Sequence, residues 1–178
     1  MIHKGTVSLE TERLVIRPFE NSDLPDLYEI MRKPEVMYAW EHGFSLEETQ
    51  EWLKRQQDRF INNGMGEQAV CLKVTGALIG AAGFLEINLE GKTVMEIGYI
   101  FDNKVWGNGY ATETAKALEQ AAFDTLGVDK LYCTMRSENN PSIKVAERLG
   151  FKLVSEYVKV YNGKDMLHSI YILERDAR

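Results

Sequence analysis

The spacing of apolar residues in the first third of the chain predicts one strand and two helices. The segment 11–19 predicts a strand, with Leu14 and Ile16 on one face and Val15 on the other. Ser22 stands where it can cap a short helix with an apolar stripe, and Pro34 ends that helix. A second helix is expected soon after it.

The second helix is marked at both of its ends. Ser45 and Glu48 have the spacing of a capping box, and Asn63 with Gly64 closes the helix. The apolar segments that follow have no helix between them, so they predict three strands of an antiparallel meander. These strands are expected at 68–74, 78–87 and 93–101.

The second half of the chain alternates helix and strand before a final hairpin. A helix with a buried apolar stripe ends at Gly127, and the turn Asn162-Gly163 separates two last strands. The stripe consists of Ala115, Leu118, Ala122 and Leu126, and the intervening strand and helix are expected at 130–135 and 141–149.

The resulting order, β-α-α-β-β-β-α-β-α-β-β, predicts the fold class. We expect a single α+β domain over residues 1–178, with a mixed, mostly antiparallel sheet of about seven strands flanked by about four helices. The strands on either side of the crossover helix are the ones expected to be parallel.

Composition narrows the class of protein. With 178 residues, 44% of them hydrophobic and 27% charged, the chain is typical of one soluble domain. The net charge of −6 disfavours nucleic acid as a partner, and no apolar stretch resembles a membrane span or a signal segment. We expect a cytoplasmic monomer or homodimer with no membrane partner. Cys71 and Cys133 lie far apart in strand-like runs, which favours buried free thiols over a disulfide or metal site.

The most informative segment, 105–113, lies between an apolar strand and the start of a helix. Gly107 and Gly109 let the backbone approach a ligand, and the free N–H groups of a helix start favour an anion such as a pyrophosphate. A dinucleotide-binding fold is the alternative. Against it, Thr112 stands at the third glycine position of that motif, and a meander before the loop does not suit a doubly wound parallel sheet.

Segments in the right order along nearly the whole chain resemble the GNAT superfamily of N-acetyltransferases. The loop sequence at 106–111, Trp-Gly-Asn-Gly-Tyr-Ala, is similar to the signature Gln/Arg-x-x-Gly-x-Gly/Ala, with Trp106 at the first position. Extended to Glu113, it resembles the RimJ and RimL branch of ribosomal-protein N-terminal acetyltransferases. The other matching segments are 11–18, 96–99 and 139–151.

The resemblance implies a three-layer GNAT-like fold and acetyl-CoA as the cosubstrate, with no metal. The pyrophosphate would bind backbone amides of the glycine loop. The pantetheine arm would follow the end of strand 93–101, where that strand and strand 130–135 splay apart. The implied cofactor-binding residues are Ile100, Phe101, Trp106, Gly107, Asn108, Gly109, Tyr110, Ala111, Thr112 and Asn139.

Acetyl transfer requires a neutral amine, a stabilised oxyanion and a proton for the departing thiolate. Glu96 is the candidate general base, because it is the only acid in 94–101 and its apolar neighbours would raise its pKa. Pairing of Glu96 with a basic residue on a neighbouring strand is the alternative. A lysine-type amine, with a pKa of about 10.4, needs a base more than an α-amine near about 7.7.

Ser142 is the candidate acid for the thiolate. Many superfamily members use a tyrosine slightly further along this helix, where residues 145–147 are Val-Ala-Glu. The alternative is a first-turn serine that bonds its own helix. The resemblance also implies a strand N–H near Tyr99 or Ile100 as the donor to the oxyanion.

Acceptor recognition is expected at segment 35–44 and at hairpin 157–165, which flank the mouth of the site in this family. Tyr38, Trp40 and Glu41 form an aromatic and acidic cluster that could bind an amine by cation–π and charge contacts. A hydrophobic plug with a solvated rim is the alternative.

The predicted function is transfer of an acetyl group from acetyl-CoA to a primary amine. Direct attack is favoured, because His3, His42 and His168 form no convincing triad with a serine or cysteine. The acceptor is a peptide N-terminus or a small-molecule amine. A noncatalytic acyl-CoA-binding regulatory module with the same fold is the alternative.

Overall fold

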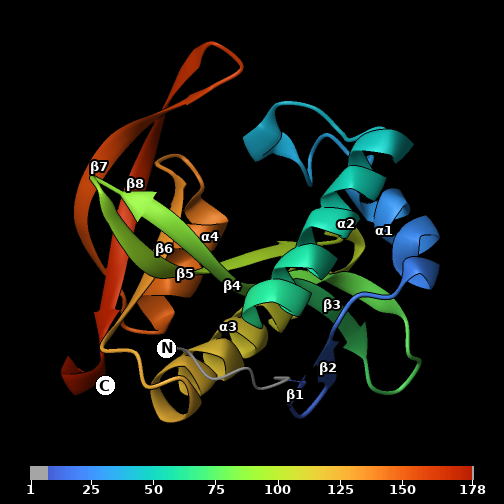
Figure 1. The fold of residues 1–178 in the computed structure, drawn as a ribbon, viewed down its shortest axis with the longest axis horizontal. Coiled ribbons are helices and arrows are strands. Elements are labelled where there is room, and N and C mark those ends of the chain that lie inside the picture. The colour runs from blue at the N-terminus through green and yellow to red at the C-terminus, as the bar shows by residue number, and fades with distance from the viewer. Residues whose placement is uncertain (1–7, 178) are drawn as a thin grey trace.

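This computed structural model describes residues 8–177. Their strands form one eight-stranded sheet (Figure 1). The strands are β1 (Leu9–Glu10), β2 (Leu14–Arg17), β3 (Gly66–Leu72), β4 (Leu78–Leu89), β5 (Lys92–Phe101), β6 (Lys130–Arg136), β7 (Lys152–Tyr161) and β8 (Lys164–Glu174). The α-helices within these residues are α1 (Leu24–Met31), α2 (Leu46–Asn63), α3 (Tyr110–Gln120) and α4 (Asn140–Arg148).

The strand order is β1-β2-β3-β4-β5-β6-β8-β7. Neighbouring strands are antiparallel except β5 and β6, which α3 connects as a crossover. The predicted meander and the predicted parallel unit are therefore confirmed. The sheet has one strand more than the expected number of about seven, because Leu9–Glu10 forms the two-residue β1 against β2.

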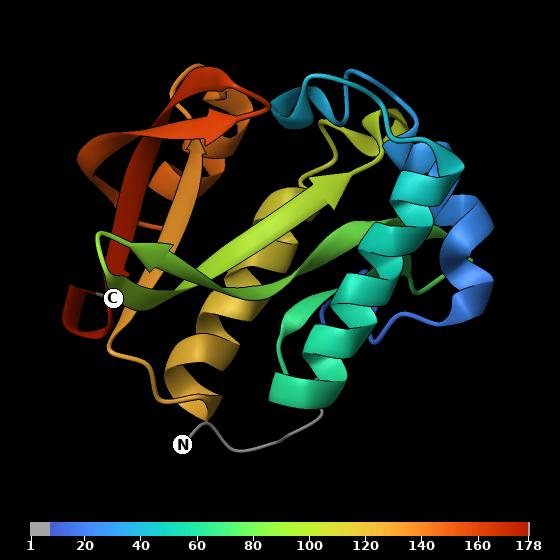
Figure 2. The same ribbon diagram turned by 45° about the horizontal axis from the view of Figure 1, so that its top comes forward.

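Helices cover both faces of the sheet, which gives three layers (Figures 1 and 2). One apolar cluster joins α1 and α2 to their face, and a larger cluster joins α3 and α4 to the other. Cys71 lies in the first cluster and Cys133 in the second, both buried as free thiols, as predicted. Within residues 8–177, no helix has the length and apolar character required to cross a bilayer.

The ends of the helices follow local signals with one exception. At α2, the Ser45 side chain accepts from the Glu48 N–H and the Glu48 carboxylate accepts from the Ser45 N–H, which confirms the capping box. Ser22 does not cap α1, so that prediction was wrong. Instead, Asp23 accepts from the Glu20 N–H at 2.8 Å and from Arg17 at 2.8 Å. A carboxylate is the stronger acceptor, so it organises the turn Asn21–Asp23 that precedes α1.

The helix after the glycine loop changes form near its end. It is α-helical to Gln120 and then widens into a π-turn over Ala121–Thr125, where the Leu126 N–H donates to the Ala121 carbonyl at 3.0 Å. Gly127 follows with φ 71°, so the predicted terminating glycine is confirmed.

Strands β5 and β6 meet at one point and then diverge. Their register has the single partnered pair Glu96 and Tyr132. Beyond Glu96, β5 remains paired with β4, where Ile100 faces Ala81. The edge of β5 that faces β6 is therefore open from the middle of the strand to its end, and Figure 2 shows the two strands separating in that direction.

Candidate active site

The loop between β5 and α3 turns on two glycines in the left-handed region. Gly107 has φ 81° and Gly109 has φ 80°, which other residues adopt only with strain. Gly109 is the N-cap of α3 and offers no side-chain acceptor to the helix. The first N–H groups of α3 are consequently open to an anion, which is the arrangement expected of a pyrophosphate site.

Several side chains of this loop make contacts that stabilise the conformation of the loop. The Trp106 indole N–H donates to the Phe101 carbonyl at 2.9 Å, and the Asn108 amide donates to the Val105 carbonyl at 2.9 Å. The Tyr110 ring is covered by a guanidinium whose carbon lies 4.4 Å from the ring centroid. Of the predicted cofactor-binding residues in the loop, Trp106, Asn108 and Tyr110 therefore hold its shape.

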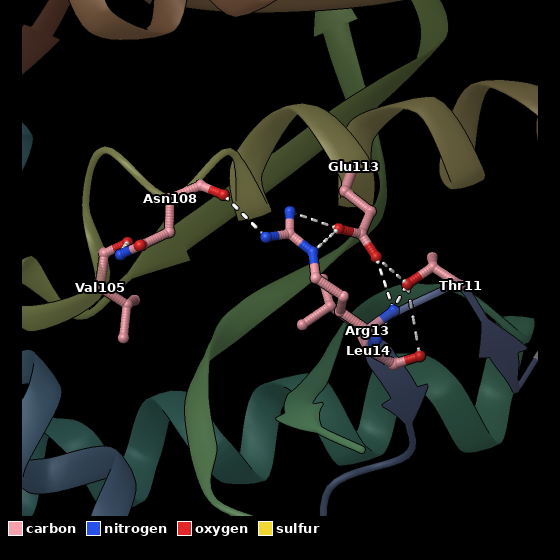
Figure 3. Close-up of polar contacts among 6 residues, drawn as sticks. All are labelled: Thr11, Arg13, Leu14, Val105, Asn108 and Glu113. Atoms are coloured by element: carbon pink, nitrogen blue, oxygen red, sulfur yellow. Dashed lines mark hydrogen bonds and ion pairs between the residues drawn. The ribbon is translucent and has the colours of Figure 1, made fainter. Parts of the chain in front are cut away.

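The guanidinium belongs to Arg13, which ties the loop to the first turn of α3 (Figure 3). It donates to the Asn108 carbonyl at 3.0 Å and, through Nε, to the Glu113 carboxylate at 2.7 Å. Glu113 also accepts from the backbone N–H of Arg13 at 2.9 Å and from the Thr11 hydroxyl at 2.5 Å. Sequence reasoning matched segment 11–18 to a family but found no role for Arg13, because its partners lie on another element.

Ile100 and Phe101 end β5 with side chains buried in opposite clusters, so only their backbone faces the open edge. On the β6 side, Asn139 is the N-cap of α4, and its Oδ1 accepts from the Ser142 N–H at 3.2 Å. The Ser142 hydroxyl interacts with the Tyr99 hydroxyl, which offsets part of the rise that burial produces in the pKa of Tyr99. Residues of β5 and α4 are thus brought together.

Glu96 lies at the point where β5 and β6 separate. It is 8% exposed, and burial raises its pKa, although hydrogen bonds from Thr134 oppose the rise. Both the Thr134 N–H, at 2.8 Å, and the Thr134 hydroxyl donate to Oε1 of Glu96. Within residues 8–177, the second oxygen, Oε2, has no hydrogen-bond or ion-pair partner. The alternative of a salt bridge to a neighbouring strand is therefore not seen, and a fixed carboxyl with one free oxygen remains.

Comparison with known proteins shows the family of this chain. The sequence pattern of the Acetyltransferase (GNAT) domain family matches residues 13–152. The chain belongs to the GNAT acetyltransferase family. It is an acetyl-CoA-dependent N-acetyltransferase, and its fold is that of the family.

Relatives of this acetyltransferase cover most of its length. The protein YkkB of Bacillus subtilis (strain 168) is 33% identical over 80% of this chain and 83% of its own. The spermidine N(1)-acetyltransferase of Escherichia coli (strain K12) is 27% identical over 84% of this chain and 79% of its own. A solved GNAT-family acetyltransferase from Bacillus anthracis has a TM-score of 0.82 and 26% identity, covering 96% of this chain and 99% of that one.

At the expected mouth of this GNAT site, segment 35–44 contacts the β7–β8 hairpin. The Lys164 ammonium lies 2.6 Å from the Glu41 carboxylate, and this hydrogen bond lowers the pKa of Glu41. Arg136 lies over the Tyr38 ring at 5.6 Å, while Trp40 packs edge-on against Phe44 at 5.9 Å. Glu41 and Tyr38 thus already face cations of the chain itself, and Trp40 packs against the apolar cluster of α1 and α2.

The histidines have local partners. His42 bonds Glu48 at 2.8 Å and the Trp40 carbonyl at 2.9 Å. His168 bonds the Met166 carbonyl at 3.1 Å. His3 lies outside the described residues.

Proposed function

We propose that this acetyltransferase moves the acetyl group directly from acetyl-CoA to a primary amine, with both substrates bound together. The observation that carries the proposal is the position of Glu96. Its free oxygen lies where the open edge of β5 begins, and the glycine loop lies beyond the other end of that edge. A thioester placed along this edge would have an anion cradle at one end and a proton acceptor at the other.

The proposed step balances within the site. The amine nitrogen attacks the thioester carbonyl carbon, the carbon–sulfur bond breaks, and the proton leaves the nitrogen for Glu96 through a water. A backbone N–H of β5 near Tyr99 or Ile100 would stabilise the oxyanion. Ser142, in contact with Tyr99, would pass a proton to the thiolate and regain one from solvent, and Glu96 would release the amine's proton to solvent.

The cosubstrate would be held mainly by backbone. Amides of the loop and of the first turn of α3 would bind the pyrophosphate, and Arg13 adds a positive charge close to it, with its guanidinium 3.6 Å from where a Cβ on Gly109 would lie. The pantetheine arm would pair with the β5 edge at Ile100 and Phe101, with Asn139 opposite. No metal is required for this chemistry.

The acceptor is proposed to be either a protein N-terminal α-amine or a small-molecule amine. The RimJ and RimL branch, which the sequence around Trp106–Glu113 resembles, favours the first. The relative named a spermidine acetyltransferase favours the second. Tyr38, Trp40 and Glu41 would line the acceptor side, where an entering ammonium must compete with Lys164 for Glu41. The buried free thiols of Cys71 and Cys133 support a reducing, cytoplasmic location. The protein is proposed to be a monomer or homodimer.

The experiment is to incubate the protein with isotopically labelled acetyl-CoA and a panel of N-terminal peptides, lysine peptides, polyamines and aminoglycosides, followed by mass spectrometry. We expect a labelled amide on one class of amine, together with free CoA thiol. Binding of CoA without a labelled product from any of these amines would contradict the proposal and favour a noncatalytic acyl-CoA-binding module.

A further inference from the structure

Glu67 of β3 is a buried acid that the proposed mechanism does not use. It is 7% exposed, and its backbone N–H donates to the Gln56 side chain of α2 at 3.1 Å. Within residues 8–177, its carboxyl oxygens form no hydrogen bond and no ion pair. Neither oxygen is fully enclosed, so the carboxyl of this otherwise buried side chain keeps contact with solvent. An acid in this position requires an explanation.

Two glycines direct this carboxyl toward β5. In the sheet register, Glu67 faces Gly83 of β4, and Gly83 faces Gly98 of β5. A Cβ on Gly83 would lie 2.9 Å from the Glu67 Cα, so the glycine permits the close approach of β3. A Cβ on Gly98 would lie 3.2 Å from Oε1 of Glu67. The space that Gly98 leaves is therefore bordered by the Glu67 carboxyl.

This position brings Glu67 near Glu96. Gly98 and Glu96 are two residues apart on β5, so they share one face of the sheet at a separation of about 7 Å along the strand. Burial, together with the negative charge of Glu96, raises the pKa of Glu67 to about 7. The Glu67 carboxyl thus titrates around neutral pH, and its titration depends on the charge of Glu96.

We propose that Glu67 is a positioning residue for Glu96: its carboxylate, which borders the space beside Gly98, strengthens the affinity of Glu96 for the proton that leaves the acceptor amine. This inference rests on the proposed function, in which Glu96 receives that proton. Ionised Glu67 disfavours a second negative charge beside it, and neutralising Glu96 with the amine's proton relieves that repulsion. The Glu67 carboxyl itself takes part in no bond change.

Other charged or titratable groups also face the pair. The positive charges of Arg59 and Lys159 oppose the effect, while Thr134 stabilises the charge of Glu96 by hydrogen bonding. Glu67 is faced by Arg59 of α2 and by Glu96 of β5. Glu96 is faced by Cys133 and Thr134 of β6 and by Tyr157 and Lys159 of β7.

The first test measures kcat against pH for the wild type, Glu67→Gln and Glu67→Asp. We expect the wild-type rate to rise through a midpoint near the Glu67 pKa of about 7. Glu67→Gln should lose that rise and fall about three- to tenfold at pH 8, with an unchanged Kd for CoA. Glu67→Asp keeps the charge and should restore the rise. The matched control is Glu86→Gln, on the exposed face of β4, which should follow the wild type.

A second test requires no turnover. In protein labelled with ¹³C at the glutamate side-chain carboxyls, the Glu67 signal is followed against pH in the wild type and in Glu96→Gln. Removing the Glu96 charge should weaken the proton affinity of Glu67 by about three- to tenfold. Identical titrations would overturn the pairing even if the enzyme is active. Absence of turnover in the wild type would instead contradict the proposed function and leave this titration as the test of the pair.

Discussion

Arg13 and Glu113 join the turn between β1 and β2 to the glycine loop. The Arg13 guanidinium bonds the Glu113 carboxylate at 2.7 Å and the Asn108 carbonyl at 3.0 Å, although Arg13 and Glu113 are 100 residues apart in the chain (Figure 3). The carboxylate also receives the Thr11 hydroxyl and the Arg13 N–H. The loop that would bind the pyrophosphate is consequently held at its middle by the β1–β2 turn and α3 together.

Glu113→Gln should therefore weaken the binding of CoA. The amide would carry no charge and could accept only part of this set of bonds, so Arg13 would no longer fix the Asn108 carbonyl. Because Arg13 is 43% exposed at its side chain, we expect a modest rise in the Kd for CoA of about three- to tenfold, measured by calorimetry. Glu12→Gln, an exposed neighbour of Arg13, is the control, and an equal loss in both variants would contradict the prediction.

Glu96→Gln should lower turnover at neutral pH by about 10²-fold or more while leaving the Kd for CoA nearly unchanged. The amide keeps the size of the side chain and can still accept from Thr134, but it cannot take the amine's proton. Initial rates across pH 6–9 check this. Unchanged rates across that range would remove Glu96 from the mechanism.

Gly109→Val and Ala111→Trp should each weaken CoA binding. At Gly109 the φ of 80° strains any side chain, and a tryptophan at Ala111 places bulk beside the first amides of α3. Gly91→Val is the matched control, since Gly91 has φ 82° in the turn between β4 and β5, far along the chain from the loop. It should lose a similar amount of stability without losing CoA affinity. Wild-type affinity in both loop variants would exclude the proposed cradle.

Glu67→Gln should stabilise the protein at alkaline pH. Burial raises the pKa of Glu67 to about 7 from its ordinary 4.5, so the folded state favours the protonated acid. The stability that this acid contributes is fully present below pH 4.5 and is lost as pH rises through about 7. The variant lacks this loss and should be more stable by about 3 kcal/mol at pH 8 and nearly equal at pH 4. Denaturant unfolding at both values measures the difference, and an equal difference at the two would contradict it.

Local signals made most of the fold predictable. The capping box of Ser45 and Glu48 and the glycine at Gly127 act within a few residues, and both appear where expected. The prediction that Ser22 caps α1 failed for a different reason. Its competitor Asp23 is strengthened by an ion pair with Arg17 at 2.8 Å, and the pattern of apolar residues contains no information about that pair.

The candidate site also contains residues that local sequence features identify and one that they do not. Gly107, Gly109 and Glu96 could be chosen from sequence, since two glycines before a helix and one acid in an apolar strand are local features. The role of Glu67 could not be predicted. Its carboxyl reaches Gly98 across an intervening strand, and that contact depends on the register of three strands.

The sequence by itself determined the element order, the antiparallel meander, the parallel crossover and the place of the glycine loop, because periodicity, caps and turns depend on neighbouring residues. Tertiary structure alone decided that Arg13 holds the loop, that Lys164 pairs with Glu41 and that Glu67 lies near Glu96. These relationships arise where strands and loops far apart in the chain are packed together, and side-chain charge acts through space rather than along the backbone.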